Sequence, residues 1–156
     1  GFRVLKRLGV AGLIATVPFI GLGGLAWGWW PFNIMAMLAV TVAVAQLADQ
    51  PGKGRFALAV AAFIVGGAFV EFWWAGVALG LAAWRYCRRP SWSALAVWIV
   101  ALASLSVINR NWWALASLPV VFAASHVRLA VPRVRWFFYA FYPLHLALLW
   151  AWVKLG

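Results

Sequence analysis

The sequence predicts an all-α, polytopic integral membrane helix bundle of about seven segments, two of which form a short or re-entrant hairpin. Hydrophobic residues make up 67% of the chain and charged residues only 10%, whereas soluble domains are about half apolar and a quarter charged. The apolar residues continue through whole segments, without the strict alternation of membrane strands. The basic residues gather in short clusters between these segments, as is typical of membrane proteins.

Proline, glycine and asparagine residues separate the apolar segments and predict where each one ends. They occur at residues 29–33, 49–55, 88–91, 109–111 and 131–133. None of these connections is long enough to be a linker, so we expect a single transmembrane domain over residues 1–156. The predicted segments are residues 8–26, 33–48, 56–70, 72–84, 92–108, 112–127 and 136–153.

The positions of the basic residues predict the orientation of the chain. If residues 3–7, 53–55, 85–89 and 128–135 share one side, every lysine and arginine except Arg110 and Lys154 lies on that side. Such an excess marks the cytoplasmic face. We therefore expect a bacterial inner-membrane protein whose N-terminus is cytoplasmic and whose C-terminus is periplasmic.

Residues 56–84 are read as a hairpin because one long crossing would place Arg85, Arg88 and Arg89 outside. The hairpin turns near Glu71. Each arm has about 15 residues and spans roughly 22 Å, which is short for a hydrocarbon core of about 30 Å. The hairpin is therefore expected to dip into the protein interior or to thin the membrane locally.

Several function classes lose their support at this stage. The net charge of +11 is distributed in clusters at the predicted membrane edges rather than along one polar face, which argues against nucleic-acid binding. Cys87 is the only cysteine, so the chain has no internal disulfide. We find no metal-ligand cluster, phosphate-binding glycine loop or nucleophile elbow, and we expect no metal.

His145 is the first candidate for chemistry. It lies in FYPLHLALLW, about midway along the last segment, where an ionisable side chain is costly and faces a polar interior, a partner or a cavity. Pro143 lies two residues earlier and removes a backbone donor from the helix. A neutral histidine bonded to another helix and a functional histidine are both compatible with this position.

Three further polar residues lie on the predicted outer side of the membrane segments. Glu71, at the tip of the hairpin, is the one acidic residue inside the apolar part of the chain. Asn33 starts the second segment, where its side chain caps the helix or meets a substrate. Arg110, in an outer turn, attracts a carboxylate or pairs with Glu71.

A resemblance to a known family rests on four sequence blocks. They are RWFFYAFYPLHLALLW at 135–150, a basic segment leading to Val17–Pro18–Phe19, PFNIMAMLAV from Pro31, and EFWWAGVALG from Glu71. In these blocks the chain resembles the TraX family, whose namesake acetylates the N-terminus of conjugative pilin subunits. The Tyr-Pro-x-His ending also resembles other membrane acyltransferases.

The resemblance implies a membrane N-acetyltransferase with acetyl-CoA as cosubstrate and a pilin, or another protein amine, as acceptor. His145 and Glu71 would then be catalytic, with His145 as general base, and Tyr142 would orient the histidine or donate to the oxyanion. Asn33 and Arg110 are assigned to the substrate. The inner arginines are assigned to the phosphates of coenzyme A; they are Arg85, Arg88, Arg89 and Arg128.

Two departures from the family pattern keep other functions open. Family members start with a membrane helix that carries an Asp-His pair, which residues 1–30 lack, and an acidic residue is expected where this chain has Thr16 and Val17. The chain is therefore expected to be a C-terminal part of a longer protein or an inactive relative. The alternatives to an acyltransferase are a membrane transporter, suggested by the short hairpin arms, and a noncatalytic membrane assembly subunit.

Overall fold

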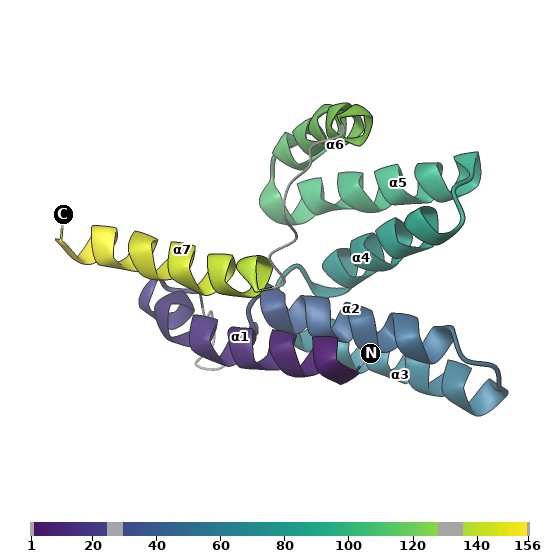
Figure 1. The fold of residues 1–156 in the computed structure, drawn as a ribbon, viewed down its shortest axis with the longest axis horizontal. Coiled ribbons are helices and arrows are strands. Elements are labelled where there is room, and N and C mark those ends of the chain that lie inside the picture. Colours follow the sequence, from purple (N-terminus) through teal and green to yellow (C-terminus); the bar gives the residue numbers. More distant parts are fainter. Residues whose placement is uncertain (1, 25–29, 128–135, 156) are drawn as a thin grey trace.

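The computed structural model describes residues 2–24, 30–127 and 136–155, and these residues form an all-α fold. This confirms the all-α part of the predicted fold class. Seven α-helices and one short 3₁₀-helix follow one another in these ranges (Figure 1). They are α1 (Phe2–Gly21), α2 (Ile34–Ala48), α3 (Lys53–Phe69), α4 (Trp73–Arg88), α5 (Trp92–Asn109), η1 (Trp113–Ala116), α6 (Ser117–His126) and α7 (Phe137–Leu155).

The helix bounds agree with most predicted segments within a few residues, and the differences fall at the basic clusters and at residues 112–127. Lys53 and Arg55 lie on α3, and Arg85 and Arg88 lie on α4, rather than in the connections between helices. α1 begins at Phe2, so the basic residues Arg3, Lys6 and Arg7 lie on the helix and not before it. The segment predicted at 112–127 is divided into η1 and the ten-residue helix α6. Pro18 and Pro143 lie inside α1 and α7 without ending either helix.

The helices form two groups that meet near the middle of the molecule (Figure 1). α1 and α7 run side by side in the same direction, and Phe19 packs against Leu146 between them. α2 and α3 form an antiparallel hairpin, and α4 packs on α2 and on α5. In Figure 1 α7 and the end of α1 extend to one side, the start of α1 lies beside α2, and α2 to α5 extend to the other side.

The start of α2 lies against the middle of α1 and beside the turn between α3 and α4. The N–H of Phe32 donates to the carbonyl of Phe69 at 2.8 Å, and the N–H of Glu71 donates to the carbonyl of Phe32 at 2.8 Å. These bonds tie the two connections together. The chain reverses direction at Val70–Phe72, which confirms the predicted turn near Glu71.

Small residues allow α4 to approach α2 closely. A Cβ atom at Gly80 would lie 2.6 Å from the Cγ2 atom of Thr41, and one at Gly76 would overlap Met37. Gly76 and Gly80, spaced four residues apart in GVALG, therefore form a helix-packing motif.

The helices present extensive apolar surface outward. α1 and α5 are long and apolar enough to cross a membrane. Exposed side chains include Leu13 and Val17 on α1, Val100 on α5 and Leu148 on α7. The predicted number of crossings and the orientation of the termini stay predictions.

Two of the basic clusters each contact a segment that is distant in the sequence. Arg88 at the end of α4 forms an ion pair with Asp49, which follows α2. Arg7 lies over the ring of Trp136, with its guanidinium carbon 4.7 Å from the ring centroid. Each contact joins segments that were predicted to lie on one side of the membrane, and that topology stays a prediction.

Candidate functional site

Asn33 is buried at the point where α2 meets α1. Its Oδ1 atom accepts a hydrogen bond from the N–H of Met35 at 3.1 Å and caps α2, as the sequence predicted. Its Nδ2 atom donates to the Gly12 carbonyl at 2.8 Å and to the Thr16 hydroxyl at 3.1 Å. The whole amide is engaged, so Asn33 fixes the start of α2 to the middle of α1.

Glu71 and Tyr142 meet at the first residue of α2. The Glu71 carboxyl and the Tyr142 oxygen both lie close to the backbone N–H of Ile34 and close enough to each other for the charge of Glu71 to act on Tyr142. An unpaired N–H in the first turn of a helix is a natural site for a negative charge. We call Thr16, Asn33, Glu71 and Tyr142 the polar junction.

The turn that carries Glu71 has an unusual backbone. Phe72 and Trp73 have φ values of 61° and 50°, in the left-handed region that aromatic residues rarely adopt. Such residues cost of order 1–3 kcal/mol each and persist where surrounding contacts fix them. Here the backbone bonds to Phe32 and the stacking of Trp30 on Trp73, at 5.9 Å between ring centroids, hold the turn. The turn therefore fixes the position of Glu71.

His145 lies one helical turn beyond Tyr142 on α7. Its Nδ1 atom is 3.0 Å from the Tyr142 carbonyl oxygen, and its ring stacks on Phe141 with centroids 5.5 Å apart. If Nδ1 carries the proton and donates to this carbonyl, the lone pair is left on Nε2. The half-buried ring lies next to that of Tyr142, with the two centroids 5.6 Å apart.

Apolar packing surrounds Tyr142. The ring packs against a cluster formed by Leu8, Ala11 and Met35 and against a second cluster formed by Ala15, Phe19 and Leu146. Tyr142 thus joins α7 to both α1 and α2. This burial leaves little freedom to its hydroxyl.

The arginines assigned to coenzyme A lie at the other end of α4. Arg85, Arg88 and Arg89 line a pocket of about 180 Å³ together with Asp49 and Trp84. The ion pair with Asp49 neutralises part of this cluster. Arg128 lies outside the described residues.

Within the described part of the chain, no hydrogen bond or ion pair joins Arg110 to the polar junction. It ends α5 with a φ of 53°, in an exposed turn. In residues 2–24, 30–127 and 136–155 the one ion pair joins Arg88 and Asp49, so the predicted pairing of Arg110 with Glu71 is not formed there. The assignment of Arg110 to the substrate stays a prediction.

Sequence reasoning assigned no binding role to a second basic pocket at the start of α1. Arg3, Lys6, Arg7, Val10 and Trp136 line a cavity of about 260 Å³. The three basic residues were interpreted as topology signals alone. Their spacing of three and four residues, which places them on one helix face, was the available signal.

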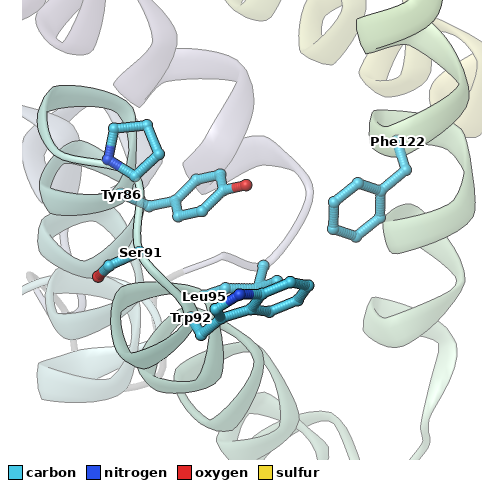
Figure 2. A pocket seen from close by; sticks show the side chains of 6 residues that line it. Tyr86, Ser91, Trp92, Leu95 and Phe122 are labelled. Carbon is cyan, nitrogen blue, oxygen red and sulfur yellow. The ribbon is translucent and has the colours of Figure 1, made fainter.

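A larger cavity of about 560 Å³ lies between α6 and the connection from α4 to α5 (Figure 2). Tyr86 points across it towards Phe122 of α6, and Trp92 and Leu95 line it from α5. Its walls are aromatic and apolar, and it contains none of the polar junction. We therefore place the chemistry at the junction and not in the largest of these cavities.

The fold and the site define an all-α protein with apolar outer faces and a small polar group at the meeting point of its helices. The family model for the TraX protein matches residues 2–153. The chain belongs to the TraX family. No curated protein and no solved structure matches it.

Proposed function

We propose that this chain is a membrane-bound acyltransferase that acetylates the N-terminal amine of a conjugative pilin, or of another protein, with acetyl-CoA as donor. Membership of the TraX family supports a role in pilin modification. The meeting of Glu71 and Tyr142 at the Ile34 N–H, with His145 one turn away, is the observation that carries the acyl-transfer reading.

In the proposed reaction the acceptor amine attacks the carbonyl carbon of the acetyl thioester. The N-terminal amine of a peptide has a pKa of about 7.7–8.0, so a base assists by keeping it unprotonated. Nε2 of His145 takes the proton as the C–N bond forms. The C–S bond then breaks, and the thiolate of coenzyme A leaves and is protonated.

The remaining residues orient the reactants. Tyr142 donates its O–H to the oxygen that becomes negative in the tetrahedral intermediate. The Glu71 carboxylate attracts the protonated amine before it loses its proton. Asn33 keeps α2 against α1, so that Ile34, Glu71 and Tyr142 stay in register.

The same proposal places the protein in the bacterial inner membrane. The outward apolar side chains of α1, α5 and α7 then face lipid, which is the partner of lowest cost for such a surface. The N-terminus of the chain is cytoplasmic and the C-terminus periplasmic. Acetyl-CoA therefore approaches from the cytoplasmic side.

A direct test mixes purified protein in detergent with acetyl-CoA that carries a deuterated acetyl group and with a pilin N-terminal peptide. Mass spectrometry of the peptide should show the labelled acetyl group on its N-terminal amine. The variant His145→Ala is compared with His126→Ala as its matched control. Nδ1 of His126 lies 2.8 Å from the carbonyl of Phe122, so this histidine makes a similar local contact away from the junction. A peptide that stays unmodified in the presence of active, folded protein would contradict acyl transfer.

A noncatalytic assembly subunit is the second candidate. The observation in its favour concerns Thr16 on α1. In the structure Thr16, at a position where the family pattern places an acidic group, has a hydroxyl bonded to Gly12 and Asn33. On this account the chain holds a partner that supplies the chemistry, and the peptide stays unmodified.

A further inference from the structure

The start of α1 and Trp136 form a pocket with an unusual combination of walls. Arg3, Lys6 and Arg7 contribute positive charge, while Val10, the indole ring and the side-chain stems give a mostly apolar lining. The guanidinium of Arg7 lies over the Trp136 ring. Tyr139 packs edge-on to the same indole, with centroids 6.2 Å apart, so the ring is held in place.

The protein supplies no carboxylate to balance this positive charge. The chain has two acidic residues. Asp49 pairs with Arg88 at the end of α4, and Glu71 is bonded to Ile34 at the polar junction. A ligand that neutralises the pocket must therefore bring its own negative charge.

The chemistry of the pocket fits phosphates attached to a planar base. Guanidinium and ammonium groups bind phosphate oxygens through charge-assisted hydrogen bonds. Aromatic faces stack on nucleic-acid bases, at about 1–3 kcal/mol per base. The nucleotide end of an acyl-CoA has both parts.

The distance from the pocket to the polar junction suits the arm of coenzyme A. Tyr142 and His145 follow Trp136 by six and nine residues, or about 9 and 14 Å along a helix. The pantetheine arm has a backbone about as long as four or five residues, which reaches at most roughly 13–18 Å. A thioester held by its phosphates in this pocket therefore reaches both side chains.

The arginines at the end of α4 are less well placed. Arg85 and Arg89 follow Trp73 by twelve and sixteen residues, which corresponds to about 18–24 Å along α4 from the turn that carries Glu71. This distance equals or exceeds the length of the extended pantetheine arm. The ion pair between Arg88 and Asp49 also lowers the charge available there.

We propose that the pocket of Arg3, Lys6, Arg7 and Trp136 binds the phosphates and the base of the acyl-CoA donor. This site deepens the proposed acyl transfer and rests on it, and it replaces Arg85, Arg88 and Arg89 as the phosphate site. The arm runs along α7 to Tyr142 and His145. A phospholipid headgroup shares the phosphate chemistry, so the test must separate the two sources.

The test measures binding of unacylated coenzyme A to the full chain in phospholipid-free detergent by isothermal titration calorimetry. Arg3→Gln combined with Lys6→Gln removes two exposed charges and should weaken binding at least about tenfold. Lys53→Gln combined with Arg55→Gln is the matched control at the start of α3 and should stay within about twofold. All variants are taken from the membrane fraction, so that only inserted protein is compared.

Two results would overturn the proposed site. One is unchanged binding in the Arg3 and Lys6 variant together with a large loss in Arg85→Gln combined with Arg89→Gln. The other is that the Arg3 and Lys6 variant no longer binds phosphatidylglycerol, added in micelles, but keeps its affinity for coenzyme A. The pocket would then bind a lipid headgroup. Arg7→Lys, which keeps the charge, should retain most of the binding and excludes loss of folding as the cause.

The same experiment separates failure of the site from failure of the proposed function. If the variant without Arg3 and Lys6 binds coenzyme A normally and acetylates the peptide, the proposed site is wrong and acyl transfer stands. If the wild type binds coenzyme A through this pocket but does not acetylate the peptide, acyl transfer is wrong. The pocket is then a binding site for nucleotide phosphates without that activity.

Discussion

The polar junction and the arm formed by α5, η1 and α6 are held together by different kinds of contact. At the junction, buried hydrogen bonds of Asn33 and a close approach at Gly12 join α1 and α2, and a close approach at Gly80 joins α2 and α4 further along these helices. In the arm, α6 is attached mainly through η1 and the ring contact of Phe122 with Trp98, with centroids 6.4 Å apart. Directional bonds fix geometry to a fraction of an ångström, whereas apolar contacts tolerate sliding. The comparison teaches that the junction is the part suited to chemistry.

The largest expected effect concerns His145. His145→Ala should slow acetylation by about 100- to 10,000-fold, the typical cost of losing a general base. His145→Asn, which keeps a hydrogen-bonding group, should be equally slow if the ring is a base and nearly normal if the ring is structural. The mass of the acceptor peptide measures the rate, and His126→Ala should stay near the wild-type rate. Full activity in a folded His145→Ala protein would show that His145 is not the general base.

The next effect is on stability and concerns the two asparagines that bond backbone atoms. Asn33→Ala should lower the free energy of unfolding by about 1–3 kcal/mol, because buried partners on α1 and α2 lose their bonds. Asn111 is the matched control in the arm, where its exposed side chain bonds Asn109 and Trp113. Asn111→Ala should cost about 0.5 kcal/mol or less. Thermal aggregation in detergent compares them, and equal losses would erase the distinction between the regions.

A smaller effect is expected from adding a methyl group at glycine. In Gly80→Ala the new Cβ atom meets the stiff, buried side chain of Thr41, and overpacking of this kind costs about 1–3 kcal/mol. The gain of about 1 kcal/mol in helix propensity offsets part of that cost. Gly54→Ala has open space around it on α3 and should be neutral or slightly stabilising. Equal thermal stability of the two variants would show that α2 and α4 are not tightly packed.

The smallest effect is expected in the arm. Tyr86→Phe keeps the stacking on Trp98, at 5.6 Å between centroids, and removes the hydroxyl that points across the cavity. The acetylation rate should stay within about twofold and the stability within about 0.5 kcal/mol. A loss as large as that of His145→Ala would move the site from the junction to the aromatic cavity.

Much of the fold could be predicted from the sequence because long apolar runs and their breakers are local signals. The turn at Glu71 followed from the distribution of arginines, and the cap at Asn33 followed from its place before an apolar run. The division of residues 112–127 into η1 and α6 was missed, because it depends on how the chain packs after Asn111.

The residues of the candidate site were predicted from the sequence, but their meeting in space was not. Glu71, Asn33, Tyr142 and His145 stood out because polar groups are rare in this chain. Their meeting depends on the start of α2 lying against Gly12, which no local pattern encodes. Arg3, Lys6 and Arg7 were explained by orientation alone. Their spacing on one helix face was a signal for a second role, but the pocket that they form with Trp136 is visible only in the structure.

The central claim is that Glu71 and His145 act on the same reacting group at the polar junction. The most direct measurement is the acetylation rate of Glu71→Gln, of His145→Ala and of the double variant, all checked for folding. Residues that act as a unit are strongly non-additive, so the double variant should be little slower than His145→Ala. Rate losses that multiply in the double variant, or single variants that keep the wild-type rate, would contradict the claim.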